Sequence, residues 1–178
     1  MASESELIAA LSAVFTLSDP SINSFKNVLV GIGDDGAVIK ASPQSSVLAT
    51  DMAVEGVHFK REWSSLHEIG AKITAANLAD VFSMGAKPTF LVVAVSLTGH
   101  EDLEWIKNLA KGIAFEAHLV GAAVVGGDLA KGAAVTIAIT ALGEVADPIL
   151  RSGAKVGDQI YLSNLSGWSR AGLAILEK

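Results

Sequence analysis

The feature that most limits the fold is a regular alternation of strand-like and helix-like segments along the chain. Residues 89–97 read Thr-Phe-Leu-Val-Val-Ala-Val-Ser-Leu, a run of β-branched and apolar residues typical of a buried strand. Apolar residues at helical spacing precede this run at 66–84 and follow it at 101–119. This order predicts helices packed against a sheet.

The other segments extend the same pattern. Ser3 and Glu6 have the spacing of a capping box and predict a helix that starts there. Apolar, β-branched runs predict strands at 28–32, 37–40, 46–53, 122–126 and 133–145, with a Gly-Gly-Asp turn region between the last two. We therefore expect an α+β fold, with a mixed β-sheet and helices packed on one face.

Composition excludes several classes of protein. Hydrophobic residues make up 51% of the 178 residues and charged residues only 18%, so the chain is not disordered. The net charge of −6 argues against nucleic-acid binding, and the lack of cysteine excludes disulfides and thiolate metal sites. The N-terminus has no signal-peptide pattern, and charges interrupt the apolar runs before they could span a bilayer. We expect a cytoplasmic protein with no membrane or nucleic-acid partner.

The chain divides into one complete and one incomplete domain. Residues 1–147 have the length and apolar content for a domain with its own core. Residues 148–178 begin with a polar, glycine-containing stretch, followed by a predicted strand at 159–163 and a helix from 168. About thirty residues bury too little apolar surface to fold alone. We expect them to be the incomplete beginning of a C-terminal α/β domain, and the chain to be the front part of a longer protein.

A glycine-rich segment at 31–36 resembles a dinucleotide-binding fingerprint but lacks its context. Gly31, Gly33 and Gly36 have the right spacing after a strand, yet the residues that follow continue as strand and turn instead of opening a helix. Asp34 and Asp35 would also repel a phosphate unless a cation lay between them. Asp34 alone is explained as a turn residue.

Further acidic residues occur in similar settings. Asp51 and Asp128 each follow an apolar run. Asp80 falls on the apolar stripe of the helix at 66–84, with Asn77 beside it, so we expect Asp80 to face inward. Converging, buried carboxylates need a counter-charge, and an oxygen-only ligand set suits Mg²⁺. Structural alternatives stay open for all three residues. Asp51 and Asp128 could be turn or capping residues, and Asp80 could pair with a distant lysine or accept hydrogen bonds from backbone N–H groups.

Five segments resemble the thiamine monophosphate kinase family, in order and in spacing. They are Gly-Ile-Gly-Asp-Asp (31–35), Ala-Thr-Asp-Met-Ala-Val-Glu-Gly-Val-His-Phe (49–59), Ala-Ala-Asn-Leu-Ala-Asp-Val-Phe-Ser-Met-Gly-Ala (75–86), Val-Gly-Gly-Asp (125–128) and Arg-Ser-Gly-Ala-Lys-Val-Gly-Asp (151–158). The wider superfamily contains aminoimidazole ribonucleotide synthetase, selenophosphate synthetase and a hydrogenase-maturation protein, all of which use ATP. The segment at 49–59 favours the kinase among them, and the resemblance reaches only about the first half of a family member.

The resemblance implies a role for each matching residue. Those expected to bind magnesium ions are Asp35, Thr50, Asp51, Asp80 and Asp128. Gly127 and Asp128 would lie at the ATP phosphates, Arg151 would contact the nucleotide, and His58 would contact thiamine monophosphate. Glu55 and Asn77 would support these ligands. Position 49, which can supply a hydroxyl ligand in relatives, is alanine here.

The resemblance also implies an activity and an assembly. The family transfers the γ-phosphoryl group of ATP to thiamine monophosphate, and it forms homodimers in which two N-terminal sheets combine into a β-barrel. We expect the 178-residue chain to be inactive alone. Two other functions are possible: a related ATP-dependent enzyme that acts on another small molecule, and a non-catalytic dimerisation or nucleotide-binding module.

Overall fold

The computed structural model describes residues 3–16, 22–162, 164 and 166–178. The chain separates into two compact units, Met1–Pro148 and Ile149–Lys178, which are described one at a time. No helix in the described part of the chain is both long and apolar enough to cross a membrane.

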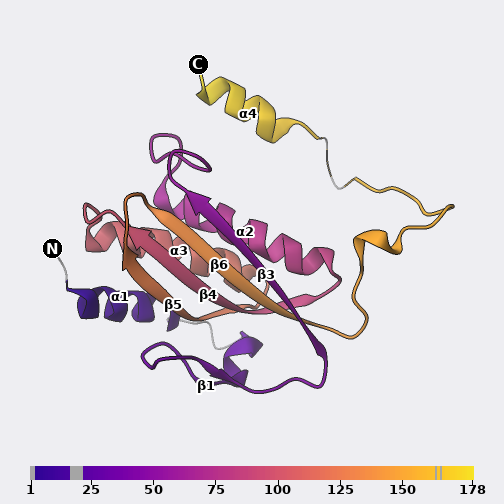
Figure 1. Cartoon of the computed structure of the whole chain (residues 1–178), viewed down its shortest axis with the longest axis horizontal. Helices are drawn as coiled ribbons and strands as arrows, with labels where there is room; N and C mark the ends of the chain where they lie inside the picture. The colour runs from indigo at the N-terminus through magenta and orange to yellow at the C-terminus, as the bar shows by residue number, and fades with distance from the viewer. Residues whose placement is uncertain (1–2, 17–21, 163, 165) are drawn as a thin grey trace. The chain divides into compact units, whose positions relative to one another are not determined.

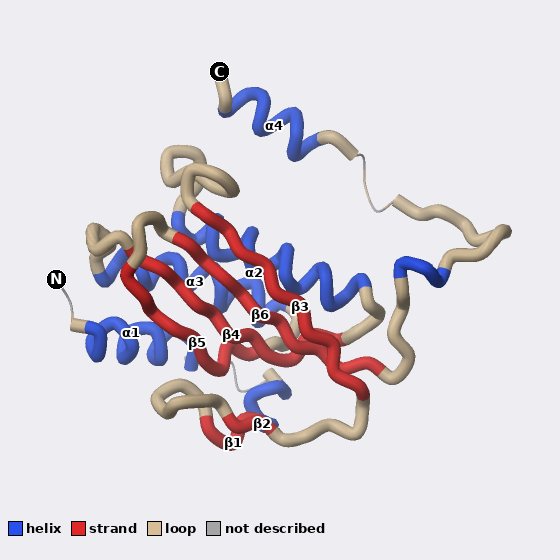
Figure 2. Tube along the Cα trace, in the orientation of Figure 1, coloured by secondary structure: helices blue, strands red, loops and turns tan. Residues whose placement is uncertain are grey.

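The first unit is built on a four-stranded mixed sheet (Figures 1 and 2). The strand order is β3 (Ser45–Val54), β6 (Thr136–Val145), β4 (Lys87–Leu97) and β5 (Ala123–Lys131). β6 is antiparallel to both of its neighbours, whereas β4 and β5 are parallel. The predicted α+β class with a mixed sheet is therefore confirmed. β1 (Val28–Val30) and β2 (Val38–Ile39) form a separate two-stranded sheet.

Three helices lie on one side of this sheet, which we call the helix-facing side. α2 (Leu66–Ser83) and α3 (Leu103–Leu119) lie against each other and against the strands, and α1 (Glu4–Thr16) packs on α3 and β5. The predicted capping box is formed, because the Ser3 N–H donates to Glu6 Oε2 at 2.7 Å and the Glu6 N–H donates to Ser3 Oγ at 3.4 Å. The core between helices and sheet includes Ile113, Ile137 and Ile139, which are almost fully buried.

The opposite side of the sheet is only partly covered. At one end, Phe90, Ala123 and Val125 form a small cluster under apolar side chains from the 3₁₀ helix η1 (Asn23–Asn27), β1 and β2. The rest of this side, which we call the open face, presents Leu48, Met52 and Val92 to solvent. Paired residues of neighbouring strands share a face, and this places Thr50, Thr140 and Asp128 on the open face as well.

Two strand predictions need correction. The Gly-Gly-Asp segment at 126–128 is not a turn, because β5 continues through it to Lys131. A register shift between Leu91 and Val92 leaves Val125 as an extra residue of β5, as in a β-bulge, and the regular pairing with β4 resumes at Gly126. The strand predicted at 159–163 is absent from 159–162, and residue 163 lies outside the described part.

The second unit contains a short 3₁₀ helix, η2 (Arg151–Gly153), and the helix α4 (Trp168–Leu176). The predicted helix from 168 is thus confirmed. Most described side chains of this unit are exposed, including the apolar Val156, Ile160 and Trp168.

A close contact between α2 and α3 sets the rotation of α2. A Cβ atom added at Gly112 would lie 2.0 Å from the backbone oxygen of His67, and one at Gly70 would lie 2.4 Å from that of Leu109. The two helices therefore meet backbone to backbone. This rotation turns Asn77 and Val81 inward and leaves Asp80 exposed. The prediction that Asp80 faces inward was wrong, because periodicity alone does not give the rotation that the glycine contact imposes.

Replacing Gly112 with alanine should separate the two helices. Alanine is intrinsically the better helix former by about 1 kcal/mol, but the clash with the backbone of α2 cannot be relieved by a side-chain rotation. We expect Gly112→Ala to lower the free energy of unfolding by about 1–3 kcal/mol in denaturant titrations. Gly36→Ala, where an added Cβ atom meets nothing within 4 Å, is the control. Equal stability of the two variants would contradict the packing argument.

Candidate functional site

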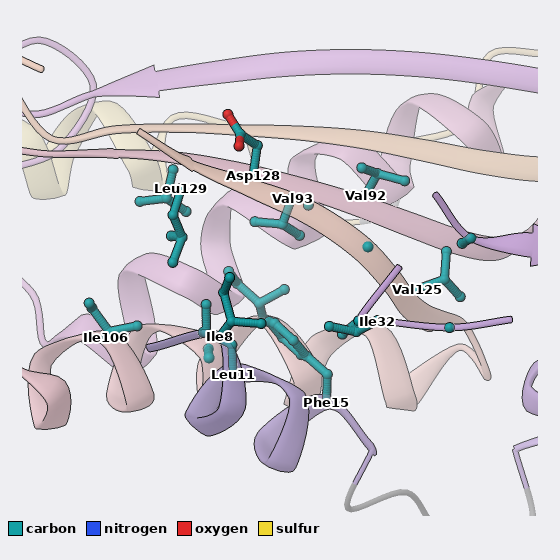
Figure 3. A pocket seen from close by; sticks show the side chains of 18 of the residues that line it. Ile8, Leu11, Phe15, Ile32, Val92, Val93, Ile106, Val125, Asp128 and Leu129 are labelled. Carbon is teal, nitrogen blue, oxygen red and sulfur yellow. The ribbon is translucent and has the colours of Figure 1, made fainter. Parts of the chain in front are cut away.

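A cavity of about 600 Å³ lies between α1, α3, the β4–β5 edge of the sheet and the loop at 31–37. Its wall is apolar and includes Leu11 and Phe15 of α1 and Ile106 of α3 (Figure 3). Its polar part comes from two segments far apart in the sequence, with Asp34 and Asp35 in one and Gly126, Gly127 and Asp128 in the other. The fold thus brings together three of the predicted site residues, namely Asp35, Gly127 and Asp128.

The loop at 31–37 is a turn that leads into β2. Gly33 has a φ of 125°, which favours glycine, and the Asp35 N–H donates to Asp34 Oδ1 at 2.9 Å. Asp34 therefore acts as a turn residue, as the sequence predicted. The segment after Gly36 forms a strand and not a helix, so the dinucleotide-binding interpretation was correctly rejected.

Gly127 and Asp128 lie within β5, opposite Val93 and Ala94 of β4. A Cβ atom at position 127 would be only 2.0 Å from the Val93 backbone oxygen, so a larger residue would push the strands apart. Figure 3 shows the carboxylate of Asp128 pointing away from Ile106 and Leu11, which is the direction of the open face. Asp128 therefore borders the cavity through its backbone and presents its charge on the other side of the sheet.

A second group of predicted residues, Asp51, Asn77 and Asp80, lies at the outer edge of β3 and on the neighbouring helix α2. The Asp51 N–H donates to Oδ1 of the fully buried Asn77 at 2.9 Å, and Asn77 Nδ2 donates to the Ile73 carbonyl at 3.0 Å. Asp80 lies one helical turn further along α2. The hydrogen bond of Asn77 thus holds the strand with Asp51 beside the helix with Asp80, and both carboxylates are exposed to solvent.

The remaining predicted residues have different environments. Thr50 is on the open face, where its hydroxyl lies 2.8 Å from that of Thr140. His58 is exposed in the loop after β3, and the Val54 N–H donates to its Nδ1 at 3.1 Å. Glu55 forms an ion pair with Arg61 of the same loop. Arg151 is exposed in η2 of the second unit.

The predicted metal ligands form two groups and not one. Asp51 and Asp80 are at the β3 edge and Asp35 and Asp128 at the β5 edge, with β6 and β4 between them. Three strand spacings separate the edges by roughly 14 Å. Among the described residues, no group of three or more acidic or histidine side chains is close enough to hold one ion.

The chemistry of each group nevertheless suits magnesium. Mg²⁺ is usually held by one or two carboxylates together with water and substrate phosphates, and it does not require a cage made by the protein alone. None of the four aspartates forms an ion pair with a described lysine, arginine or histidine. Their charges are therefore available to a cation.

Comparison with known proteins identifies the family. The model of the family described as "AIR synthase related protein, N-terminal domain" matches residues 33–145. The chain belongs to this family. The matched range contains Asp35, Thr50, Asp51, Asp80 and Asp128, so both groups of aspartates lie in the family's domain.

Among individual relatives of this AIR synthase related chain, the thiamine-monophosphate kinase of Corynebacterium glutamicum is 39% identical over 150 residues, which are 82% of this chain and 45% of that protein. A crystal structure of thiamine monophosphate kinase from Aquifex aeolicus has a TM-score of 0.73 at 28% identity and covers 77% of this chain and 47% of that one. A structure of AaThiL complexed with AMPPCP and TMP has the same TM-score at 27% identity and covers 98% and 52%. The chain spans about half the length of these relatives.

The cavity wall contains residues that the sequence did not single out. Phe15 and Trp105 both line it, and Trp105 Nε1 is buried without a hydrogen-bond partner among the described residues. Both aromatic residues lie on helices whose pattern indicates only a core-facing side. No local motif distinguishes a helix face that packs against the sheet from one that lines a cavity beside it.

Asn77 should be more important for stability than its exposed neighbour Asp80. Asn77→Ala removes the acceptor for the Asp51 N–H and leaves a buried gap, so we expect the free energy of unfolding to fall by about 1–3 kcal/mol. Asp80→Ala should change it by less than about 0.5 kcal/mol, because its side chain is exposed. Chemical denaturation of both variants tests this difference, and a larger loss for Asp80→Ala would contradict the assigned rotation of α2.

Proposed function

We propose that this chain is the metal- and nucleotide-binding part of an ATP- and Mg²⁺-dependent thiamine monophosphate kinase, which makes thiamine diphosphate. The observation that supports this most directly is that Asp35 and Gly127 line one cavity, which Asp128 borders through its backbone, in segments that resemble the kinase. The relative from C. glutamicum bears that enzyme's name, and a structural neighbour was solved with AMPPCP and TMP.

The cavity has the properties that a nucleotide requires. A nucleotide combines a flat, weakly polar base with a polyanionic tail, and the cavity combines an apolar wall with a carboxylate-bearing rim. The base would occupy the part near Phe15 and Ile106, and the phosphates would approach Asp35 and Gly127. Arg151 of the second unit would contact the nucleotide, and His58 would contact the substrate phosphate.

The reaction needs positioning more than acid–base chemistry. An oxygen of the acceptor phosphate forms a bond to the γ-phosphorus of ATP, and the bond from that phosphorus to the β,γ-bridging oxygen breaks, which releases ADP. The attacking oxygen is already ionised at neutral pH, so no general base is needed. Magnesium, when bound, neutralises the charge that two polyanions bring together. The chain's part is to hold cations with Asp35, Thr50, Asp51, Asp80 and Asp128. Because the reaction consumes ATP, we also propose that the enzyme works in the cytoplasm.

Substitution of the aspartates tests the proposal in the intact gene product. We expect Asp80→Asn and Asp128→Asn each to lower turnover by about 10²–10³-fold at saturating ATP, as expected when a group that stabilises transition-state charge is removed. Asp35→Asn should weaken Mg²⁺-dependent binding of AMPPCP in calorimetry. Asp34→Asn is the matched control, because asparagine keeps the acceptor for the Asp35 N–H.

The outcomes separate the alternatives. Activity only with another phosphorylated acceptor would identify a related ATP-dependent enzyme. If the wild-type chain bound no nucleotide in the presence of metal, the chain would be interpreted as a dimerisation module. Unchanged turnover of Asp80→Asn at saturating Mg²⁺ would remove Asp80 from the mechanism.

We also propose that a second copy of the chain covers the open face, so that two sheets form a barrel. Leu48 and Met52 are 66% and 58% exposed on this face of the sheet. The outer edges of β3 and β5 have no neighbouring strand in the described part, and exposed apolar edges of this kind are normally covered. Eight strands also give a barrel whose interior side chains can fill.

Light scattering on paired variants tests the dimer. We expect the wild-type chain to have the mass of a dimer and Leu48→Asp to have that of a monomer, because a charge would be buried at the interface. Leu119→Asp is the matched control, since Leu119 is 65% exposed on α3, away from the open face. A dimeric Leu48→Asp, or a wild-type monomer at all concentrations, would contradict the proposed interface.

A further inference from the structure

The loop at 55–62, which carries His58, is held by hydrogen bonds within the loop and to its neighbours Val54 and Val135. The Glu55 N–H donates to the Val135 carbonyl at 2.9 Å, and the Gly56 N–H donates to the Phe59 carbonyl at 2.8 Å. The Val54 N–H donates to His58 Nδ1, so the proton of the neutral ring is on Nε2. A bound phosphate oxygen would therefore meet the Nε2–H donor, in one fixed orientation of the ring.

Arg61 connects this loop to the loop that follows β4. Its Nη2 donates to Glu55 Oε2 at 2.9 Å and its Nε donates to Glu55 Oε1, which makes a bidentate pair next to Val54. Its Nη1 lies 3.6 Å from Glu101 Oε1, and its guanidinium carbon lies 5.8 Å from the centre of the Trp105 ring. One side chain thus contacts both loops and the first turn of α3.

Glu101, the partner of Arg61 in this contact, is itself held in place by several hydrogen bonds. Its side chain is fully buried and accepts hydrogen bonds from the Thr98 N–H, the Thr98 hydroxyl and the Gly99 N–H at 2.8–3.0 Å. Burial disfavours the charged form, but these hydrogen bonds together outweigh it and hold the pKa of Glu101 below its usual value. An exposed ion pair alone would contribute little, whereas the bidentate pair and the buried partner give Arg61 a defined geometry.

We infer that Arg61 is a positioning residue for substrate binding. It keeps the loop at 55–62 against Glu101, so that His58 presents Nε2–H to the acceptor phosphate. This inference rests on the proposed kinase function, because the acceptor phosphate is the group that His58 would bind. Arginine is required because its planar fork contacts Glu55 through two nitrogens and Glu101 through the third.

The experiment compares Arg61→Met, Arg61→Lys and the control Lys60→Met in the intact gene product. Lys60 is the neighbouring cation of the same loop and lies over the Trp63 ring. We expect Arg61→Met to raise the KM for thiamine monophosphate by roughly ten- to a hundredfold, as follows from the loss of charge-assisted hydrogen bonds, with an unchanged KM for ATP. Arg61→Lys, which can keep one contact, should be intermediate, and Lys60→Met should resemble the wild type.

A second measurement does not depend on activity. Nitrogen-15 NMR of the histidine rings should show the single Nε2–H tautomer of His58 in the wild type and a mixture of tautomers in Arg61→Met. A wild-type KM together with a single tautomer in Arg61→Met would overturn the inference, as would an equal loss in Lys60→Met. A wild-type enzyme without thiamine monophosphate kinase activity would instead refute the proposed function, and the NMR comparison would still decide the role of Arg61.

Discussion

The strand order β3–β6–β4–β5 determines where the acidic residues of this chain lie on the sheet, and therefore which of them can share a cation. β6 forms two antiparallel pairings, with β3 and with β4, and is buried on its helix-facing side, so its neighbours cannot exchange places without losing the core. Asp51 and Asp128 lie on the two outer strands and are therefore kept apart. The same order leaves both outer strands without a further neighbouring strand among the described residues, and it places Asp128 and Thr50 on one face, away from the helices.

The charges of these residues have a consequence for binding. The chain has a net charge of −6, and four aspartates at the two sheet edges lack a described cationic partner. Such a surface repels a polyanion, so the proposed nucleotide would bind only together with cations that offset these charges. A site of this kind also keeps its fold without the metal, because the aspartates are exposed and solvated. Asn77, which is neutral, makes the buried contact in their place.

The sequence predicted the helices, most strands and the mixed sheet, because each depends on a local pattern. Sequence-based prediction failed where contacts between distant segments determine the structure. The Gly-Gly-Asp segment has the composition of a turn, yet its pairing with β4 keeps it in a strand. At position 127 glycine is required, because any side chain would clash with the Val93 carbonyl. Asp80 fell on the expected stripe, but the contact of Gly112 with α2 rotates it outward. Likewise, no local pattern pairs Arg61 with Glu101, which lies forty positions later in the sequence.

The loops at one end of the sheet show how the fold joins these distant parts. β3, β4 and β5 all run toward the same end, because β3 and β4 are both antiparallel to β6 and β5 is parallel to β4. The loop with His58 and the loop with Glu101 therefore emerge at the same end of the sheet, one strand apart, where α3 begins. A single arginine can then connect a predicted substrate contact to the helix that forms the cavity wall. Topology brings these segments together, and the fork of Arg61 fixes their relative position.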